Sequence, residues 1–294
     1  MSRKTLFTGA ATALITPFNE EGVDFTALGN IIDYQIDNGI DALVICGTTG
    51  EAATMPDKEH LSVIDYAVKR VAGRVPVIAG TGSNDTAHCV ELSVESQNLG
   101  ADGLLITTPY YNKSTQKGLI MHYDKVLEKT NLPIILYNVP GRTGMSYAVS
   151  TIKELARDER IVGIKEASGN ISYATEVASS CPDLTMYSGN DDMIVPVLSL
   201  GGKGVISVLS NVAPKETHEL CQKWFDGDIN GSRELQFKYL ELINSLFCEV
   251  NPIPVKTAMN MMGFSAGKLR LPLCEMDPVN YKRLENAMKE CGLI

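Results

Sequence analysis

The 294-residue sequence lacks the features that mark membrane and nucleic-acid-binding proteins. No apolar run approaches the roughly 20 residues of a membrane-spanning helix. No run of lysines or arginines forms a basic patch, and 26 basic against 35 acidic residues give a formal net charge of −9. We therefore expect no membrane span, no nucleic-acid partner and no anionic membrane partner. Low-complexity tracts and flexible linkers are also missing.

Cysteine pairs with metal-binding or redox spacing are absent. The seven cysteines are an odd number, and no two form a CxxC pair. This usage is typical of reduced thiols and predicts a cytoplasmic protein without a disulfide framework.

The N-terminal stretch MSRKTLFTGAATALITPF begins with positive charge and continues with apolar residues, as a signal peptide does. Thr8, Gly9, Thr12 and Thr16 interrupt the apolar part, and no cleavage pattern follows. We therefore expect a first strand here.

The chain does contain a repeated alternation of short apolar runs and amphipathic stretches. The runs are AATALITPF, ALVICGTTGE, VPVIAGTG, DGLLITTPYY, LPIILYNVPGRTG, IVGIKEASG, LTMYSGND and GVISVLSN. Strands that alternate with helices pair in parallel, and continuously apolar strands are covered on both faces. Eight such units predict an α/β fold of the (β/α)8 TIM-barrel type. The alternative, an open doubly wound sheet, usually has a glycine-rich turn after its first strand, which TPFNEEG is not.

Helix boundary signals divide the chain further. Pro56 and Asp57 predict the start of one helix, with Gly73 near its end, and Asn84 or Asp85 caps a second that stops at Gly100. We place the barrel in residues 1–228. Residues 229–294 contain three predicted helices, which form a C-terminal helical extension packed on the barrel.

The C-terminal ends of barrel strands carry the chemistry in this fold. The predicted ends hold hydroxyls, phenols, one lysine, one arginine and glycines: Gly47–Glu51, Thr107–Tyr111, Tyr137–Arg142, Lys165, Ser188–Asp191 and Ile206–Ser207. The four histidines, His60, His88, His122 and His218, all fall in helical stretches. No metal site is therefore expected. GGKG at 201–204 precedes its strand, so no phosphate site is expected there either.

Lys165 stands at the end of an apolar run, where an idle buried ammonium would be costly. In water-poor surroundings an amine is nucleophilic and can form a Schiff base with a carbonyl compound. The iminium then makes the adjacent carbon acidic. Tyr137 can relay protons, and the hydroxyls of Thr48 and Thr49 can hold a carboxylate. The alternative is a solvated strand end.

Other residues have simpler interpretations. Tyr110 and Tyr111 could be packing aromatics, and Arg142 could pair with a surface carboxylate. We expect Cys46 to be a small core residue. We expect Asn251 of NPIPVK to cap a helix and Lys256 to be a solvated helical residue.

The motifs GTTGE, TPYYN, YNVPGRTG, GIKEASG, SGND, GVISV and NPIPVK occur in the order and spacing of the dihydrodipicolinate synthase family. This resemblance covers essentially the whole chain. The wider superfamily includes N-acetylneuraminate lyase and other class I pyruvate aldolases, which share the lysine and the tyrosine. They tend to carry serine where Thr48 stands and usually lack GRTG. Thr48 and Arg142 therefore favour the synthase branch.

The resemblance implies an enzyme that condenses pyruvate with L-aspartate 4-semialdehyde to 4-hydroxy-tetrahydrodipicolinate, for diaminopimelate and lysine biosynthesis. It implies no cofactor and a homotetramer built from tight dimers. Lys165 would form the Schiff base. Tyr137, Thr49 and Tyr111 would form a proton relay, with Tyr111 reaching in from a neighbouring subunit.

The resemblance also implies the binding residues. Thr48 and Thr49 would hold the pyruvate carboxylate. Arg142 would hold the carboxylate of the second substrate, because its planar guanidinium can donate two parallel hydrogen bonds to a carboxylate. Gly189 and Ile206 would line the site through their backbone. Two alternatives stay open: a lyase acting on sialic acid or a keto-sugar acid, and a catalytically silent binding protein.

Some family members are inhibited by lysine at a dimer-interface pocket. The matching positions here are Ala52, Asp57, His60, Asn84, His88 and Tyr110. Sensitive enzymes place a glutamate where His88 stands, and a neutral imidazole meets an ammonium less well. We therefore predict weak or absent inhibition by lysine.

Overall fold

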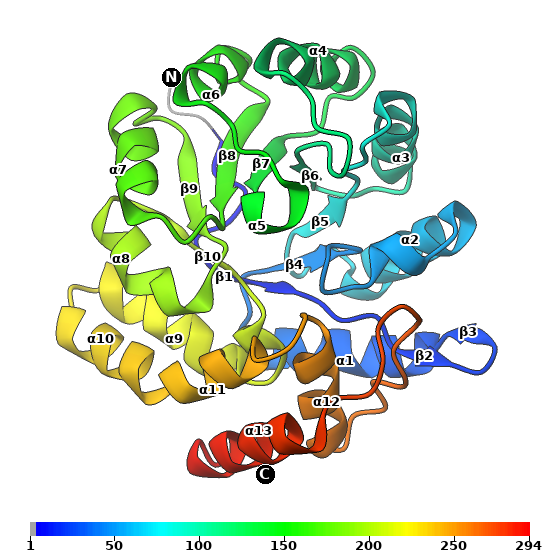
Figure 1. Cartoon of the computed structure of the whole chain (residues 1–294), viewed down its shortest axis with the longest axis vertical. Helices are drawn as coiled ribbons and strands as arrows, with labels where there is room; N and C mark the ends of the chain where they lie inside the picture. The colour runs from blue at the N-terminus through cyan, green and yellow to red at the C-terminus, as the bar shows by residue number, and fades with distance from the viewer. Residues whose placement is uncertain (1–3) are drawn as a thin grey trace.

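A closed barrel of eight parallel strands forms the centre of the computed structural model, which describes residues 4–294 (Figure 1). The strands follow the order β1-β10-β9-β8-β7-β6-β5-β4 around the barrel. They are β1 (Gly9–Ala13), β4 (Ala42–Ile45), β5 (Val77–Gly80), β6 (Gly103–Thr107), β7 (Ile134–Asn138), β8 (Ile161–Glu166), β9 (Thr185–Ser188) and β10 (Gly204–Ser207). Seven lie within their apolar runs and β1 begins one residue before its run, at Gly9, so the predicted TIM barrel is confirmed.

Side chains fill the barrel interior. Small residues on β1 and β4, such as Ala11 and Ala42, leave room for larger ones such as Ile135 on β7. Phe7, just before β1, stacks on Tyr187 of β9 with ring centroids 4.2 Å apart, and the Tyr187 hydroxyl donates to the Phe7 carbonyl at 2.7 Å. Apolar residues are packed on both faces of the strands, as continuous runs predict.

Helices surround the barrel in Figure 1. The outer helices are α1 (Phe25–Asp37), α2 (Asp57–Val71), α3 (Thr86–Asn98), α4 (Gln116–Leu127), α6 (Val149–Leu155), α7 (Ile171–Ser180), α8 (Ile194–Ser199) and α9 (Pro214–Phe225). The Asp85 side chain caps α3 by accepting from the backbone N–H of Ala87, as one of the two predicted caps would. A hairpin of β2 (Phe18–Asn19) and β3 (Gly22–Val23) follows β1, and the short helix α5 (Pro140–Thr143) follows β7.

The C-terminal extension has four helices where the sequence predicted three. They are α10 (Ile229–Lys238), α11 (Leu240–Leu246), α12 (Ile253–Met261) and α13 (Pro278–Glu290). The first predicted helix is interrupted at the buried Tyr239, whose ψ of 0° departs from helical geometry. α9 ends at Phe225 before α10 begins; the division of the chain into units at residue 228 stays a prediction.

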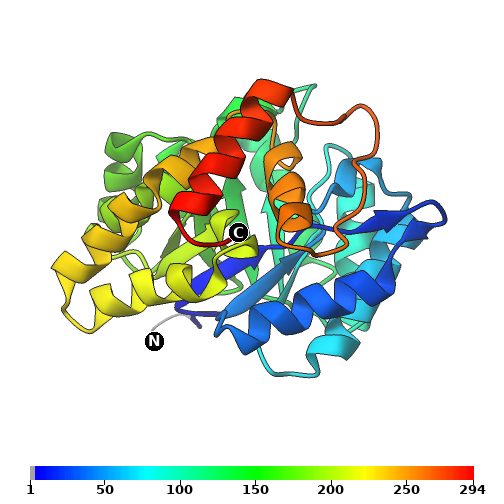
Figure 2. The same ribbon diagram turned by 90° about the horizontal axis from the view of Figure 1, so that it is seen from below.

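The extension packs against the barrel beside α1, α9 and the loops that follow the last two strands (Figures 1 and 2). α10 contacts α9, while α11 contacts the 3-10 turns η2 (Asp191–Met193) and η3 (Leu209–Asn211). These turns lie at the C-terminal ends of β9 and β10, so the extension reaches the end of the barrel that carries the predicted site. Within residues 4–294, no helix combines the length and the apolar character of a membrane span.

Candidate active site

Lys165 is buried at the C-terminal end of β8. It pairs in register with Tyr137 of β7 and with Tyr187 of β9, two residues of the barrel interior. Its exposure is 6%, and Nζ lies 4.4 Å from the centroid of the Tyr137 ring. The solvated strand end is therefore the wrong interpretation. The amine sits in a water-poor mouth against a phenol.

Gly189, directly after β9, gives the lysine side chain its space. A Cβ at this position would lie 3.1 Å from Cε of Lys165 and 2.5 Å from Cβ of Ala167. The second distance is too short for two methyl groups. Ile206 is fully buried on β10 and belongs to the barrel interior. Gly189 thus lies beside Lys165, and the role of both residues in lining the site stays a prediction.

One buried carboxylate, Asp191, interacts with the charge of Lys165, and a second, Glu166, follows the lysine on β8. Asp191 Oδ2 accepts from the backbone N–H groups of Val208 at 3.0 Å and Leu209 at 2.9 Å. Burial raises the pKa of Asp191, while its hydrogen bonds and the charge of Lys165 act in the opposite direction. Burial likewise raises the pKa of Glu166, which accepts from Asn138 Nδ2 at 2.7 Å. Asp191 thus joins the loops after β9 and β10, and Glu166 joins the end of β7 to the loop after β8 through Asn138 and the Ser168 N–H.

Thr49 is buried in the loop that follows β4, and Thr48 beside it is exposed. The loop is a tight turn in which Gly50 N–H donates to Gly47 O at 3.1 Å. Cys46 is buried, as expected, and it and Glu51 both have φ of 56°. Among residues 4–294 no hydrogen bond joins Thr49 to Tyr137.

The Thr49 hydroxyl instead accepts from Asn251 Nδ2 at 3.0 Å. Asn251 is therefore not a helix cap, and Pro252 occupies that position for α12. The expected solvated Lys256 is also wrong: it is 1% exposed, and its Nζ contacts Glu51 Oε1 at 2.8 Å. A cation in a helix is usually solvated, and the carboxylate that pairs with this one lies about two hundred residues away in the chain.

Tyr111 and Arg142 are exposed in the single chain, unlike the buried Lys165, Tyr137 and Thr49. Tyr111 is 93% exposed, with φ of 68°, in the loop after β6. Arg142 is exposed on α5, the short helix that follows the strand of Tyr137. Within residues 4–294, no carboxylate forms an ion pair with Arg142, so its predicted surface pairing is not seen.

Asp191 interacts with Lys165 and Asn251 bonds to Thr49, and the sequence assigned neither of them a catalytic or binding role. Asp191 belongs to the SGND motif at a strand end, so its position near the predicted site could be predicted from the sequence. Asn251 belongs to NPIPVK, far from any barrel strand, and only the folded contact identifies its partner.

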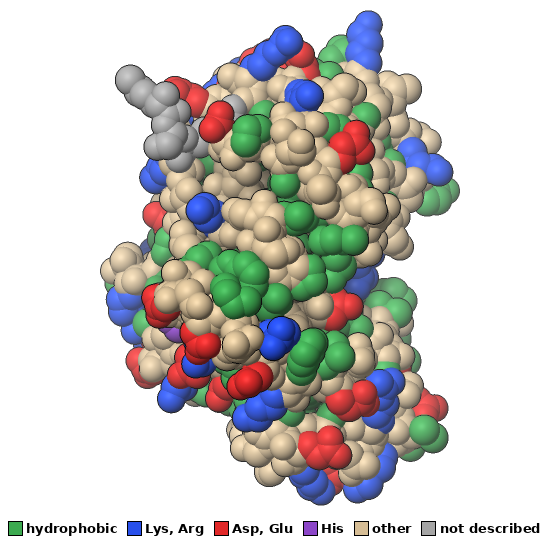
Figure 3. All heavy atoms as spheres, turned by 90° about the vertical axis from the view of Figure 1, so that its left-hand side faces the viewer, with side chains coloured by type: hydrophobic (Ala, Val, Ile, Leu, Met, Phe, Trp, Pro, Cys, Tyr) green, Lys and Arg blue, Asp and Glu red, His purple; other side chains and the backbone are tan. Residues whose placement is uncertain are grey.

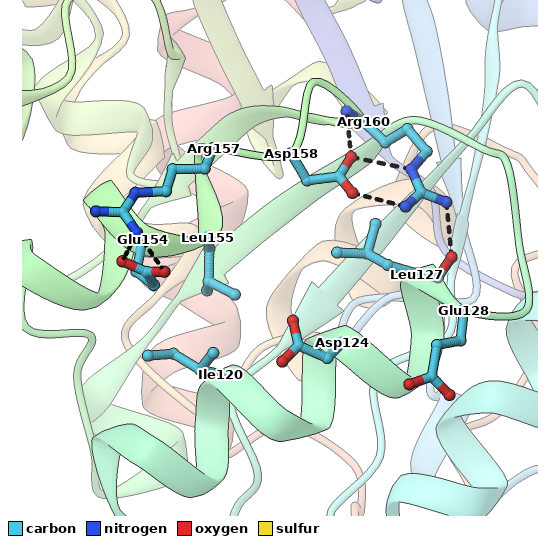
Figure 4. Close-up of a pocket in the computed structure, with 9 residues that line it drawn as sticks. All are labelled: Ile120, Asp124, Leu127, Glu128, Glu154, Leu155, Arg157, Asp158 and Arg160. Carbon is cyan, nitrogen blue, oxygen red and sulfur yellow. Dashed lines mark hydrogen bonds and ion pairs between the residues drawn. The ribbon is translucent and has the colours of Figure 1, made fainter.

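A cavity of about 470 Å³ lies elsewhere, between α4 and α6 near the start of β8 (Figure 4). Its two arginines are paired locally: Arg160 with Asp158 at 2.6 Å and Arg157 with Glu154 at 2.7 Å. It lies at the opposite end of β8 from Lys165. We therefore assign it no part in the chemistry.

The histidines lie in α2, α3, α4 and α9, as predicted. Within residues 4–294, no group of three or more His, Cys, Asp or Glu side chains is arranged to hold a metal. All seven cysteines are free thiols.

Comparisons with known proteins agree with this geometry. The sequence model of the dihydrodipicolinate synthetase family matches residues 6–291. The 4-hydroxy-tetrahydrodipicolinate synthase of Acetivibrio thermocellus is 56% identical over 293 residues, which cover 99% of this chain and 100% of that protein.

Solved structures give the same result. The dihydrodipicolinate synthase of Aquifex aeolicus superposes with a TM-score of 0.96 at 45% identity, covering 98% of this chain and 99% of that one. The chloride-inhibited dihydrodipicolinate synthase of Acinetobacter baumannii, complexed with pyruvate, gives 0.95 at 40% identity, covering 99% and 100%. The chain belongs to the dihydrodipicolinate synthetase family.

Proposed function

We propose that this chain is a 4-hydroxy-tetrahydrodipicolinate synthase that condenses pyruvate with L-aspartate 4-semialdehyde through a Schiff base on Lys165. The observation that carries the proposal is the buried amine of Lys165, 4.4 Å from the Tyr137 ring at the barrel mouth. Relatives across the full chain length carry the same enzyme name.

The lysine supplies the first bond of the reaction. Its neutral amine adds to the ketone carbon of pyruvate, and loss of water leaves an iminium. The iminium draws electrons from the neighbouring methyl group, so that group loses a proton and an enamine forms. The enamine carbon attacks the aldehyde, whose oxygen gains a proton and becomes the 4-hydroxyl. The amino group of the second substrate then attacks the former ketone carbon, closes the ring and releases Lys165.

Hydroxyl groups move the protons in these steps. Tyr137 lies beside the amine and exchanges protons with the forming and breaking C–N and C–O bonds. Thr49 and Tyr111 extend this relay toward solvent. The 93% exposure of Tyr111 supports a role across an interface, because a phenol that acts in another subunit is uncovered in a single chain.

The carboxylates of the two substrates bind at different places. Thr48 and Thr49 hold the carboxylate of pyruvate with hydroxyl and backbone donors, close to Lys165. Arg142 holds the carboxylate of aspartate semialdehyde, and the absence of an ion pair to it among residues 4–294 supports this assignment. Gly189 and Ile206 line the site through their backbone.

We further propose a homotetramer of tight dimers in the cytoplasm. The seven free thiols support a reducing compartment. Hydrophobic side chains gather near the middle of the face shown in Figure 3, and Ile171 at the start of α7 is 40% exposed. Exposed apolar groups of this kind are typical of subunit contacts.

An assay with both substrates tests the proposal. Wild-type protein given pyruvate and aspartate semialdehyde should form the heterocycle, while N-acetylneuraminate should not be cleaved. Arg142→Ala should raise the half-saturating concentration of the semialdehyde roughly 10- to 100-fold and leave that of pyruvate almost unchanged. Cleavage of N-acetylneuraminate without condensation would assign the chain to the lyase alternative.

A further inference from the structure

The loop that carries Thr48 and Thr49 is held by a segment from the other end of the chain. Asn251 Nδ2 donates to Thr49 Oγ1 at 3.0 Å. Two residues further along the loop, Glu51 Oε1 accepts from Lys256 Nζ at 2.8 Å, and Glu51 Oε2 accepts from Arg270 N–H at 3.1 Å. These contacts join the loop after β4 to the C-terminal extension.

The Asn251–Thr49 bond has a defined direction. An amide NH₂ group can only donate, so the Thr49 oxygen accepts in this bond. A threonine hydroxyl has one proton, and that proton is then free to donate to another group. Thr49 is 3% exposed and Asn251 is 6% exposed, so water does not compete strongly for the bond.

The surroundings keep the asparagine in place. Lys256, five residues further along the same segment, is buried against Glu51 and lies over the Phe18 ring at 4.5 Å. Arg270 also lies over this ring and pairs with Glu59. Glu51 has φ of 56°, a conformation that non-glycine residues rarely adopt and that its two hydrogen-bonded partners stabilise here. The extension therefore holds the loop of Thr49 on one side of the bond and the segment of Asn251 on the other.

We propose that Asn251 is a positioning residue for pyruvate binding: it occupies the Thr49 oxygen as a donor and thereby directs the Thr49 proton toward the pyruvate carboxylate. This inference rests on the proposed function, since it requires that a keto acid binds beside Lys165. In this account the C-terminal extension completes the substrate site without touching substrate.

Asn251→Asp tests the direction of the bond. The aspartate has nearly the same shape, but its ionised carboxylate only accepts, so the Thr49 proton turns toward it and away from the substrate. We expect the half-saturating pyruvate concentration to rise roughly 10- to 100-fold. That of aspartate semialdehyde should change by less than about threefold, which is within the scatter of context effects. The readouts are initial rates and the pyruvate dependence of borohydride-trapped adduct.

Asn260→Asp is the matched control. Asn260 lies on α12, the helix that follows Asn251, and within residues 4–294 its side chain bonds only to the backbone of Ala266 and Gly267. This variant should bind pyruvate as wild type does. Thermal unfolding of both variants separates a binding defect from a folding defect.

A double-mutant cycle tests whether Asn251 acts on pyruvate binding through the Thr49 hydroxyl. In Thr49→Val the hydroxyl is absent, so adding Asn251→Asp should cause no further loss of pyruvate affinity. A folded Asn251→Asp protein with unchanged pyruvate dependence would overturn the inference, as would an equal effect of Asn251→Asp with and without the Thr49 hydroxyl.

If Asn251→Asp does not fold, the pyruvate affinities of Thr49→Ser and Thr49→Val are compared instead. The inference then requires that serine keeps pyruvate affinity and that valine loses it, and equal affinities would overturn it. A wild-type protein that traps no pyruvate at all would instead refute the proposed function.

Discussion

His88 has partners on both ring nitrogens, which bears on regulation by lysine. Its Nε2 lies 2.9 Å from Asp57 Oδ1, and its Nδ1 lies 3.1 Å from Ser83 Oγ. The ring is thus engaged with its own chain at the position where the family resemblance predicts a glutamate in lysine-sensitive enzymes. A ligand ammonium that approached this position would meet an imidazole instead of a glutamate, and the neighbouring Asp57 carboxylate is already engaged by the His88 ring.

We therefore predict weak or absent inhibition by lysine in the wild-type enzyme. His88→Glu supplies a carboxylate and should lower the half-inhibiting lysine concentration by roughly tenfold, the effect expected of one charged hydrogen bond. Dose-response curves with lysine measure both values, and His88→Gln is the neutral control. Micromolar half-inhibition of the wild type would contradict the prediction.

An almost fully buried ion pair joins α12 to the loop after β4. Lys256 and Glu51 are 1% and 0% exposed, so each depends on the other for charge compensation. Burial lowers the pKa of Lys256, and the charge and hydrogen bond of Glu51 raise it again in part. Removing one partner would leave a buried charge without compensation.

Lys256→Met should lower the free energy of unfolding by about 3–5 kcal/mol because it leaves the Glu51 carboxylate alone in the interior. Lys268→Met is the matched control, since Lys268 is 83% exposed in its ion pair with Glu20, and such pairs contribute about 0–1 kcal/mol. Urea unfolding measures both changes. Equal losses in the two variants would show that the buried pair has no special importance.

The strands were predictable from the sequence, whereas the contacts between distant elements were not. Each barrel strand is short, apolar and buried on both faces, so a run of consecutive residues is enough to predict it. The side chain of Asn251, by contrast, bonds a threonine 202 residues away, and a buried asparagine looks like a cap until its partner is known. The interruption at Tyr239 was missed because its helical pattern continues on both sides.

The strand-end position of Lys165 could be read from the sequence because its strand is a clear apolar run. The proposed role of Tyr111 in the proton relay could only be inferred from the family resemblance. In a single chain this tyrosine is almost fully exposed, so the proposed relay requires the proposed neighbouring subunit.

At the scale of the whole molecule, subunit mixing tests the role of Tyr111. Lys165→Ala and Tyr111→Ala chains should each be nearly inactive alone. If Tyr111 acts in the neighbouring subunit, a mixed dimer contains one site with both groups, so activity should return after the two proteins are unfolded and refolded together. Refolding each variant separately is the control. A mixture no more active than the sum of its parts would place Tyr111 in its own chain's site.

The central claim is that the buried amine of Lys165 captures a keto acid, and mass spectrometry after pyruvate and borohydride treatment tests it most directly. Wild-type protein should gain the mass of one reduced pyruvate adduct per chain, located on the peptide that contains Lys165. Lys165→Ala and Lys165→Arg should gain none. A full adduct in either variant, or none in the wild type, would contradict the account.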